Sequence, residues 1–349
     1  MAAVVPEVAL APVGERALAL AREYAVAPHQ LRPGNELTLL RAGGETFPAM
    51  LAAIAAARRS IILETYILEN DRTGARFAAA LRERARAGVT VRLMYDGVGG
   101  FGVDDAYVAA LRSDGVQVLV YHPVAPWRRR FHLTRRDHRK ILVVDDVVGF
   151  AGGLNIGDDY AALVDGGRGW HDMHCQVRGP VVIDLARLFR RVWINEGGPP
   201  YPIPSGRSGR GDGAPRQPPA PGMALARIVD NRKYRKRRAI RRAYLRAINR
   251  AERTIHLENA YFLPDLGLAA ALTRAVKRGV AVRVIVPGDS DVTAVHYASL
   301  WAHRTLVKHG IQILHWLGSM MHAKTAVIDG AWSTVGSYNL DNVSLLYNL

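Results

Sequence analysis

Two short segments each carry a histidine and a lysine one residue apart, followed by an aspartate. The first contains His138, Lys140 and Asp145, and the second repeats the spacing with His322 and its neighbours Lys324 and Asp329. Alternate residues of an extended strand point to one face, so the histidine and lysine of each block should project together. Each aspartate lies at an odd offset from its histidine and should face the other way. We therefore expect two catalytic histidine–lysine pairs and two structural or orienting aspartates.

A second signal follows each block at the same distance. The first copy reads GGLN and ends at Asn155, whereas the second reads GSYN, with Ser337 and Asn339. Lysine and asparagine can hold the oxygens of a phosphodiester and stabilise its transition state. One imidazole can attack phosphorus while the other acts as general acid and base. The residue types thus predict phosphodiester chemistry without a metal or cofactor.

The residues around the two blocks are also duplicated. Residues 53–97 and 247–291 each read as an aliphatic strand ending in glutamate, an aromatic residue, an alanine-rich helix and a second strand. This order predicts two similar α/β halves. Of the 26 residues from 197 to 222, 15 are glycine or proline, which indicates a linker. The predicted boundaries are an extension over 1–44, a first half over 45–196 and a second half over 223–349.

The amino-acid composition limits the classes of partner that the protein can bind. Among 349 residues, 47 are Lys or Arg and 31 are Asp or Glu, which gives a net charge of +16. Such an excess favours a polyanion, either a nucleic acid or an anionic membrane surface. The single cysteine, Cys175, excludes an intrachain disulfide and fits a reducing, cytoplasmic compartment. No window of the sequence is apolar enough to span a bilayer, so action on lipid is expected at the inner membrane surface.

Two basic segments are candidates for that contact. One precedes the first histidine, and the other is predicted to form a helix with one cationic and one apolar face over residues 232–246. A solvated surface is the alternative explanation for both. The predicted membrane-contacting residues are Trp127, Arg128, Arg129, Arg130, Arg235, Lys236, Arg237 and Arg238.

The paired blocks resemble the HKD motifs of the phospholipase D superfamily, from about residue 45 to the end. The stretches WHDMHCQVRGP (170–180), ENAYFLP (258–264), PGDSD (287–291) and GSYNLDNVS (336–344) are similar to bacterial cardiolipin synthases without N-terminal transmembrane helices. The resemblance implies two α/β/α sandwich halves related by a pseudo-twofold axis, with one active site at their interface. It also implies phosphatidyl transfer through a phosphohistidine.

The resemblance further implies residue roles. His138 is favoured as the nucleophile and His322 as the general acid and base, while both lysines and both asparagines hold the phosphate. Ser337 can add a hydroxyl. Asp172 is the candidate acid that orients the histidine of the first half. The family pattern continues to a second acid after GSYN. Either the sequence is truncated at Leu349 or the second histidine lacks that partner.

Glu64 and Glu258 end the duplicated strands, where they either orient lysine or histidine groups or simply cap the strand ends. Three functions remain open from the sequence. The first is a cardiolipin synthase-like phosphatidyltransferase, with phosphatidylglycerol as donor and acceptor, accompanied by hydrolysis when water enters. The alternative is a phosphodiesterase or nuclease, and the third is a non-catalytic lipid-binding relative. Two blocks in one chain disfavour the nuclease, and no obligatory protein partner is expected.

Overall fold

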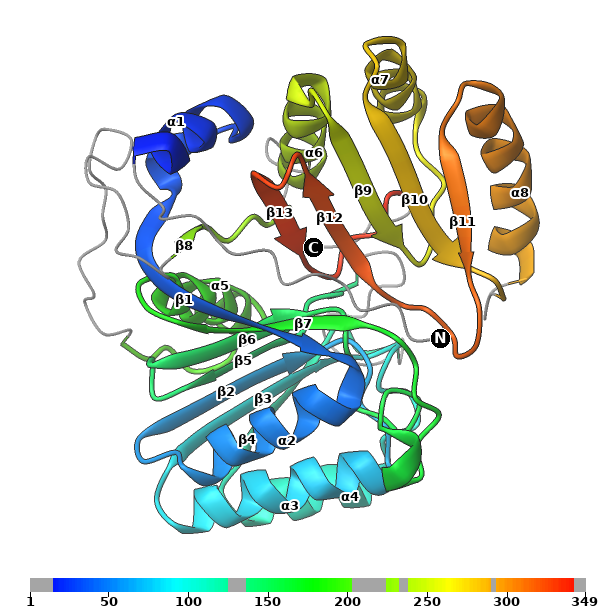
Figure 1. The fold of residues 1–349 in the computed structure, drawn as a ribbon. Coiled ribbons are helices and arrows are strands. Elements are labelled where there is room, and N and C mark those ends of the chain that lie inside the picture. Colours follow the sequence, from blue (N-terminus) through cyan, green and yellow to red (C-terminus); the bar gives the residue numbers. More distant parts are fainter. Residues whose placement is uncertain (1–14, 125–135, 203–223, 232–237, 290–292, 342–349) are drawn as a thin grey trace.

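The computed structural model describes residues 15–124, 136–202, 224–231, 238–289 and 293–341. These residues form two β-sheets with their helices, one sheet for each predicted half (Figure 1). The predicted linker over 197–222 falls largely outside the described residues. Within the described part of the chain, no helix is long and apolar enough to cross a membrane.

The first sheet has eight strands in the order β4-β3-β2-β5-β6-β7-β1-β8. Strands β2, β3 and β4 are parallel, whereas β5, β6, β7, β1 and β8 follow by antiparallel pairing. The strands are β1 (Arg32–Arg41), β2 (Ser60–Thr65), β3 (Thr90–Asp96), β4 (Gln117–Tyr121), β5 (Ile141–Val144), β6 (Val148–Gly152), β7 (Met173–Arg178) and β8 (Ala224–Ala226).

Helices cover both faces of this sheet (Figure 1). On one face, the apolar sides of three helices share a core with the strands, and on the other face one long helix packs alone. The three are α2 (Ala42–Ala55), α3 (Arg72–Arg86) and α4 (Asp105–Ser113), and the fourth is α5 (Val181–Asn195). The alanine-rich pattern of α3 places Phe77 and Leu81 against the sheet, as a helical period requires. The first half is therefore an α/β/α sandwich.

The second sheet repeats the central part of the first. Its order is β11-β10-β9-β12-β13, which matches β4-β3-β2-β5-β6 strand for strand. The strands are β9 (Thr254–Asn259), β10 (Ala281–Pro287), β11 (Gln312–Trp316), β12 (Lys324–Ile328) and β13 (Trp332–Val335), and the helices are α6 (Ala239–Arg250), α7 (Leu266–Lys277) and α8 (Thr293–Lys308). The mixed α/β class and the two-half arrangement predicted from the sequence are confirmed.

The N-terminal segment belongs to both halves. Strand β1, which the sequence analysis placed in an extension over 1–44, pairs with β7 inside the first sheet. Helix α1 (Glu15–Tyr24) contacts α6 instead, and Tyr24 lies in the core of the second half. Two short 3-10 helices complete the elements, η1 (Pro28–Gln30) and η2 (Leu163–Asp165). Alternating polar and apolar residues in β1 gave too weak a strand signal to move the predicted boundary.

Candidate active site

The first histidine lies just before β5, at the edge where the parallel strands of the first sheet end. His138 Nδ1 is 2.9 Å from the backbone oxygen of Ser337, which belongs to the second half. A carbonyl oxygen can only accept, so Nδ1 carries the hydrogen and Nε2 keeps its lone pair. Burial, then the neighbouring Lys140 and Lys324, lower the pKa of His138 well below its ordinary value. The ring is therefore neutral near pH 7, as a nucleophile must be.

The second histidine occupies the equivalent position before β12. His322 Nδ1 is 2.7 Å from a carboxylate oxygen of Asp172, which is fully buried at the start of β7. Burial raises the pKa of Asp172 to about 6. Burial and the two lysines lower the pKa of His322, while a carboxylate at this distance stabilises its protonated form.

This contact corrects the predicted pairing. Asp172 was assigned to the histidine of its own half, but it bonds the histidine of the other half. The reason is that the segment between β6 and β7 leaves the first half and contacts the second half. In that segment His171 donates its N–H to Met320 and accepts through its carbonyl from the N–H of His322, at 2.8 and 2.7 Å. Of the two alternatives left open for His322, the one in which this histidine has no acid partner is contradicted by this contact.

A glycine makes room for this acid. A Cβ added at Gly153, the second residue of GGLN, would lie 2.1 Å from Asp172 Oδ1. The second half has Ser337 at the same position, where it contributes its backbone carbonyl to His138. The change from glycine in GGLN to serine in GSYN thus follows the difference between the two histidine partners.

Both lysines are buried beside their histidines. Lys140 and Lys324 are 3% and 1% exposed, and each Nζ donates to the carbonyl of the histidine two residues earlier. Burial and then the charge of Lys324 lower the pKa of Lys140 well below its ordinary value. Two cationic groups held together away from water favour an anion between them. An anionic group is therefore favoured here, and phosphate binding by the two lysines stays a prediction.

The asparagines differ in what they contact. Asn155 accepts from the N–H of Ile67 at 3.1 Å and donates to Tyr160 Oη at 2.7 Å, so both ends of its amide are engaged by the protein. Asn339 is 4% exposed, and its Oδ1 has no hydrogen-bond partner within the described residues. Phosphate binding by either side chain stays a prediction.

The motif aspartates lie at the other end of their strands. The carboxylate of Asp145 accepts from the backbone N–H groups of residues 58–60 at 2.7–2.8 Å. Asp329 accepts from those of residues 252–254 at 2.7–2.8 Å and also from Tyr24 Oη at 2.7 Å. Both aspartates tie the start of the neighbouring strand and lie away from the histidines.

The two strand-end glutamates have unlike surroundings. Glu64 is 1% exposed and lies 3.1 Å from Arg139, on the face opposite the histidine. Arg139 also holds Asp137 through two bonds of 2.8 and 2.9 Å. Burial raises the pKa of Glu64 well above its ordinary value, although the charge of Arg139 acts in the opposite direction. Glu258 instead accepts from the Thr325 hydroxyl at 2.7 Å.

Several aromatic residues of the site were not identified from the sequence. The ring centroid of Tyr66 lies 4.8 Å from that of His138, and Lys140 Nζ is 5.1 Å from the same tyrosine ring. Tyr160, Trp170 and Tyr261 surround His322 at centroid distances of 5.5, 6.2 and 6.5 Å. The aromatic residue that follows each duplicated glutamate was the signal for Tyr66 and Tyr261.

The predicted membrane-contacting residues fall almost entirely outside the described residues, namely Trp127, Arg128, Arg129, Arg130, Arg235, Lys236 and Arg237. Arg238 is described and is exposed at the start of α6. Among the described residues, no group of three His, Cys, Asp or Glu side chains could hold a metal ion.

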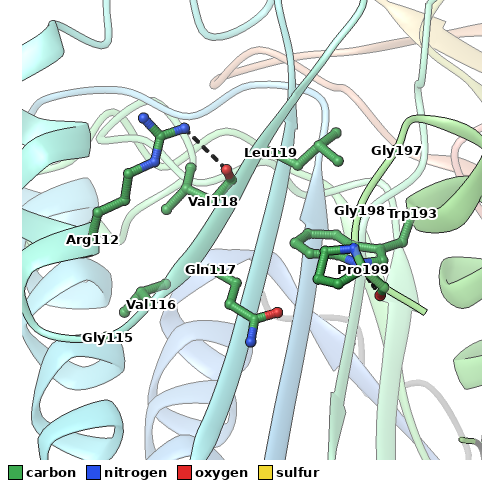
Figure 2. Close-up of a pocket in the computed structure, with 10 residues that line it drawn as sticks. All are labelled: Arg112, Gly115, Val116, Gln117, Val118, Leu119, Trp193, Gly197, Gly198 and Pro199. Atoms are coloured by element: carbon green, nitrogen blue, oxygen red, sulfur yellow. Dashed lines mark hydrogen bonds between the residues drawn. The ribbon is translucent and has the colours of Figure 1, made fainter. Parts of the chain in front are cut away.

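Figure 2 shows residues that line a pocket beside β4, the edge strand of the first sheet. The volume of this pocket is about 450 Å³. Its lining includes Arg112, which donates to the carbonyl of Val118 at 3.1 Å, and Trp193, which donates to that of Pro199. None of the histidines or lysines described above lines it, so it is separate from the candidate active site.

The sequence matches a family model described as "Cardiolipin synthase, PLD-like domain" over residues 50–193 and 244–349. The chain belongs to this family. It is 32% identical to cardiolipin synthase A of Pseudomonas syringae pv. syringae over 97% of this chain and 70% of that protein. It is 36% identical to cardiolipin synthase B of Salmonella typhi over 91% of this chain and 76% of that protein.

Solved structures show the same fold at low sequence identity. Phosphatidylserine synthase of Haemophilus influenzae Rd KW20 superposes with a TM-score of 0.65 at 13% identity, covering 96% of this chain and 84% of its own. Polyphosphate kinase of Porphyromonas gingivalis gives 0.53 at 14% identity, covering 86% and 45%. The family assignment therefore comes from the sequence matches, and these structures agree with its fold.

Proposed function

We propose that the protein is a cardiolipin synthase-type phosphatidyltransferase. It transfers a phosphatidyl group from one phosphatidylglycerol to the hydroxyl of another and releases glycerol. The observation that carries this proposal is the meeting of two histidine–lysine pairs from different halves, each histidine with Nδ1 engaged. Membership of the cardiolipin synthase family supports the substrate class.

In the first step, Nε2 of His138 attacks the phosphorus of the donor. A P–N bond forms and the P–O bond to the glycerol headgroup breaks. His322 gives its Nε2 proton to the departing oxygen, and the Asp172 carboxylate at 2.7 Å stabilises the imidazolium that supplies it. Lys140 and Lys324 balance the negative charge that gathers on the non-bridging oxygens.

In the second step, the acceptor hydroxyl loses its proton to His322 and attacks phosphorus. The P–N bond breaks, and both histidines return to their starting states. Water in place of the acceptor would give phosphatidic acid, so transfer depends on exclusion of water from the site. The protein would work at the surface of an anionic membrane, on its cytoplasmic side.

A direct assay tests this function. Purified protein is incubated without added divalent metal, first with phosphatidylglycerol vesicles and separately with single-stranded DNA. Formation of cardiolipin and glycerol supports the proposal, and phosphatidic acid alone would restrict it to hydrolysis. DNA cleavage without lipid turnover would replace the proposal by the nuclease alternative.

The roles of the histidines can be separated with a substrate whose leaving group needs no proton. His138→Ala should reduce turnover of phosphatidylglycerol below detection, and His322→Ala by about 10²–10⁴-fold. A phosphatidyl ester of p-nitrophenol should restore the first step in His322→Ala but not in His138→Ala. The matched control is His256→Ala, since this histidine is exposed on β9. The opposite rescue pattern would make His322 the nucleophile.

A further inference from the structure

Several large apolar side chains are exposed to solvent along one edge of the molecule. Among the described residues, six are 74–95% exposed: Phe101, Leu163, Val164, Leu266, Trp301 and Leu317. All except Trp301 follow the carboxyl end of a strand, namely β3, β6, β9 or β11. This is the edge that carries both histidines. We call Leu163, Val164 and Leu317 the apolar lip.

The apolar lip has one side from each half. A Cβ added at Gly169 would meet Leu163 at 3.2 Å, and two residues later His171 stacks on Trp316 with ring centroids 4.1 Å apart. Leu317 follows Trp316 directly. Figure 1 shows the loop from β11 to β12 reaching the segment between β6 and β7 of the first half, where His171 pairs with Met321. Residues 169–171 therefore connect both sides of the lip to the segment that carries Asp172.

The position of these exposed apolar side chains, at the edge that carries the histidines, indicates that they have a function. Single exposed hydrophobic residues are ordinary on protein surfaces. Here the most exposed ones gather at the active-site edge, whereas Val147, in the turn at the opposite edge, is 53% exposed. A phospholipid offers its phosphate at the membrane–water boundary while its acyl chains stay in the bilayer. An enzyme that reaches the phosphate must bring the surrounding surface to the same depth.

We propose that the apolar lip inserts into an anionic phospholipid bilayer and brings His138 and His322 to the level of the lipid phosphates. The occupant is a membrane rather than a protein because the chain carries a net charge of +16, which favours anionic headgroups. This inference rests on the proposed function for its choice of partner. It assigns the insertion to Leu163, Val164 and Leu317, outside the basic segments predicted from the sequence.

Vesicle flotation tests the lip directly. Leu163→Asp with Val164→Asp, and separately Leu317→Asp, should each weaken binding to phosphatidylglycerol–phosphatidylcholine vesicles about tenfold, as expected when a buried apolar side chain is lost from the bilayer. Val147→Asp is the matched control and should bind as the wild type does. The wild type should also retain part of its binding at about 1 M salt, where charge attraction is screened beyond about 3 Å.

Two further measurements keep lipid binding separate from catalysis and folding. Turnover of monomeric dihexanoyl phosphatidylglycerol should stay within about twofold of the wild type in every lip variant. Brominated acyl chains should quench more of the fluorescence in Leu317→Trp/Trp316→Phe than in Trp316→Phe alone, and the difference reports the added indole at position 317. If the wild type turns over no short-chain lipid, the proposed function is refuted. Flotation and quenching would still show whether the apolar lip inserts into the bilayer.

Three results would overturn the inference. The first is equal vesicle binding by the lip and control variants, and the second is no quenching of the tryptophan at position 317. The third is a loss of short-chain turnover as large as the loss on vesicles, which would place these residues in the chemistry or the folding. A changed mass in light scattering with unchanged vesicle binding would assign the lip to a second copy of the chain.

Discussion

The two halves hold equivalent histidines in different ways. In the first half, His138 stands between Asp137 and Arg139, which form a buried pair on the far face of the strand together with Glu64. In the second half, His322 stands between Met321 and Ala323, which pack in a small apolar cluster. The strand that carries the histidine is thus held by buried charges in the first half and by apolar packing in the second. This difference is visible in the sequences DHRK (137–140) and MHAK (321–324).

The comparison also shows that neither half completes its own site. Asp172 comes from the first half and holds His322, while the Ser337 carbonyl comes from the second half and holds His138. The partners differ in charge, because one is a carboxylate and the other a neutral carbonyl. This difference supports His322 as the group that carries a proton and His138 as the one that attacks.

The largest expected effect follows from removing the charged partner. Asp172→Asn keeps the size of the side chain but cannot stabilise the imidazolium of His322, so kcat should fall by about 10²–10⁴-fold. Because burial raises the pKa of Asp172 to about 6, wild-type activity should decline as the pH falls below about 6, where the carboxyl becomes protonated. The Asn variant should lack this acidic limb. A pH–rate profile from about pH 5 to 8 measures both.

Gly153→Ala is the companion variant. Its Cβ would press on the Asp172 carboxylate, so it should lower kcat in the same direction while leaving the carboxylate in place. Unchanged kcat in Asp172→Asn, with a normal pH profile, would show that the contact between the halves does not support catalysis. It would also remove the reason for assigning different roles to the two histidines.

An intermediate effect is expected from the buried charges of the first half. Arg139→Ala copies the second half at one position but leaves the Asp137 carboxylate buried without its partner, which should cost about 3–5 kcal/mol of unfolding free energy. The double variant Asp137→Met/Arg139→Ala copies MHAK fully and should recover most of that loss. Denaturant unfolding of both proteins measures the difference.

Glu64→Gln provides the control for this pair. Burial raises the pKa of Glu64 and so favours its neutral form, which a glutamine of the same shape imitates, and the substitution should change stability by less than about 1 kcal/mol. If Arg139→Ala is as stable as the wild type, the ion pair does not hold the catalytic strand. If the double variant is no more stable than Arg139→Ala, the two halves are not interchangeable in this respect.

The sequence predicted the features that are duplicated in the two halves, but it did not predict the contacts that one half makes with the other. Duplicated spacing was enough for the two α/β halves, for both histidine–lysine pairs and for the far-facing aspartates. It could not assign Asp172 to His322, because spacing along one half says nothing about contact with the other. Glu64 and Glu258 look equivalent in sequence, yet only Glu64 meets an arginine, because position 139 is Arg and position 323 is Ala. Strand β1 was missed because its own residues gave only a weak strand signal.

The smallest expected effect separates the two motif aspartates. Asp145 and Asp329 both have φ near +55° at the turn that follows their strand, a conformation that asparagine also tolerates. Asn substitution at either position should therefore cost only about 1–2 kcal/mol, through weaker bonds to the three N–H groups. Burial alone would raise the pKa values of Asp145 and Asp329, but the bonds from the N–H groups lower both pKa values. The stabilisation is thus present above about pH 4, the ordinary range of the carboxyl, and lost as the pH falls below it.

The difference between the halves lies in the bond that Asp329 alone receives from Tyr24 on α1. Tyr24→Phe should cost about 1 kcal/mol in the wild type and much less in Asp329→Asn, because the two substitutions remove one interaction. In Asp145→Asn, the cost of Tyr24→Phe should stay near its wild-type value. Denaturant unfolding of the five variants gives the coupling. Equal costs of Tyr24→Phe in all backgrounds would mean that the bond does not stabilise α1 against the second half, and that α1 is held by apolar packing of its helix on α6.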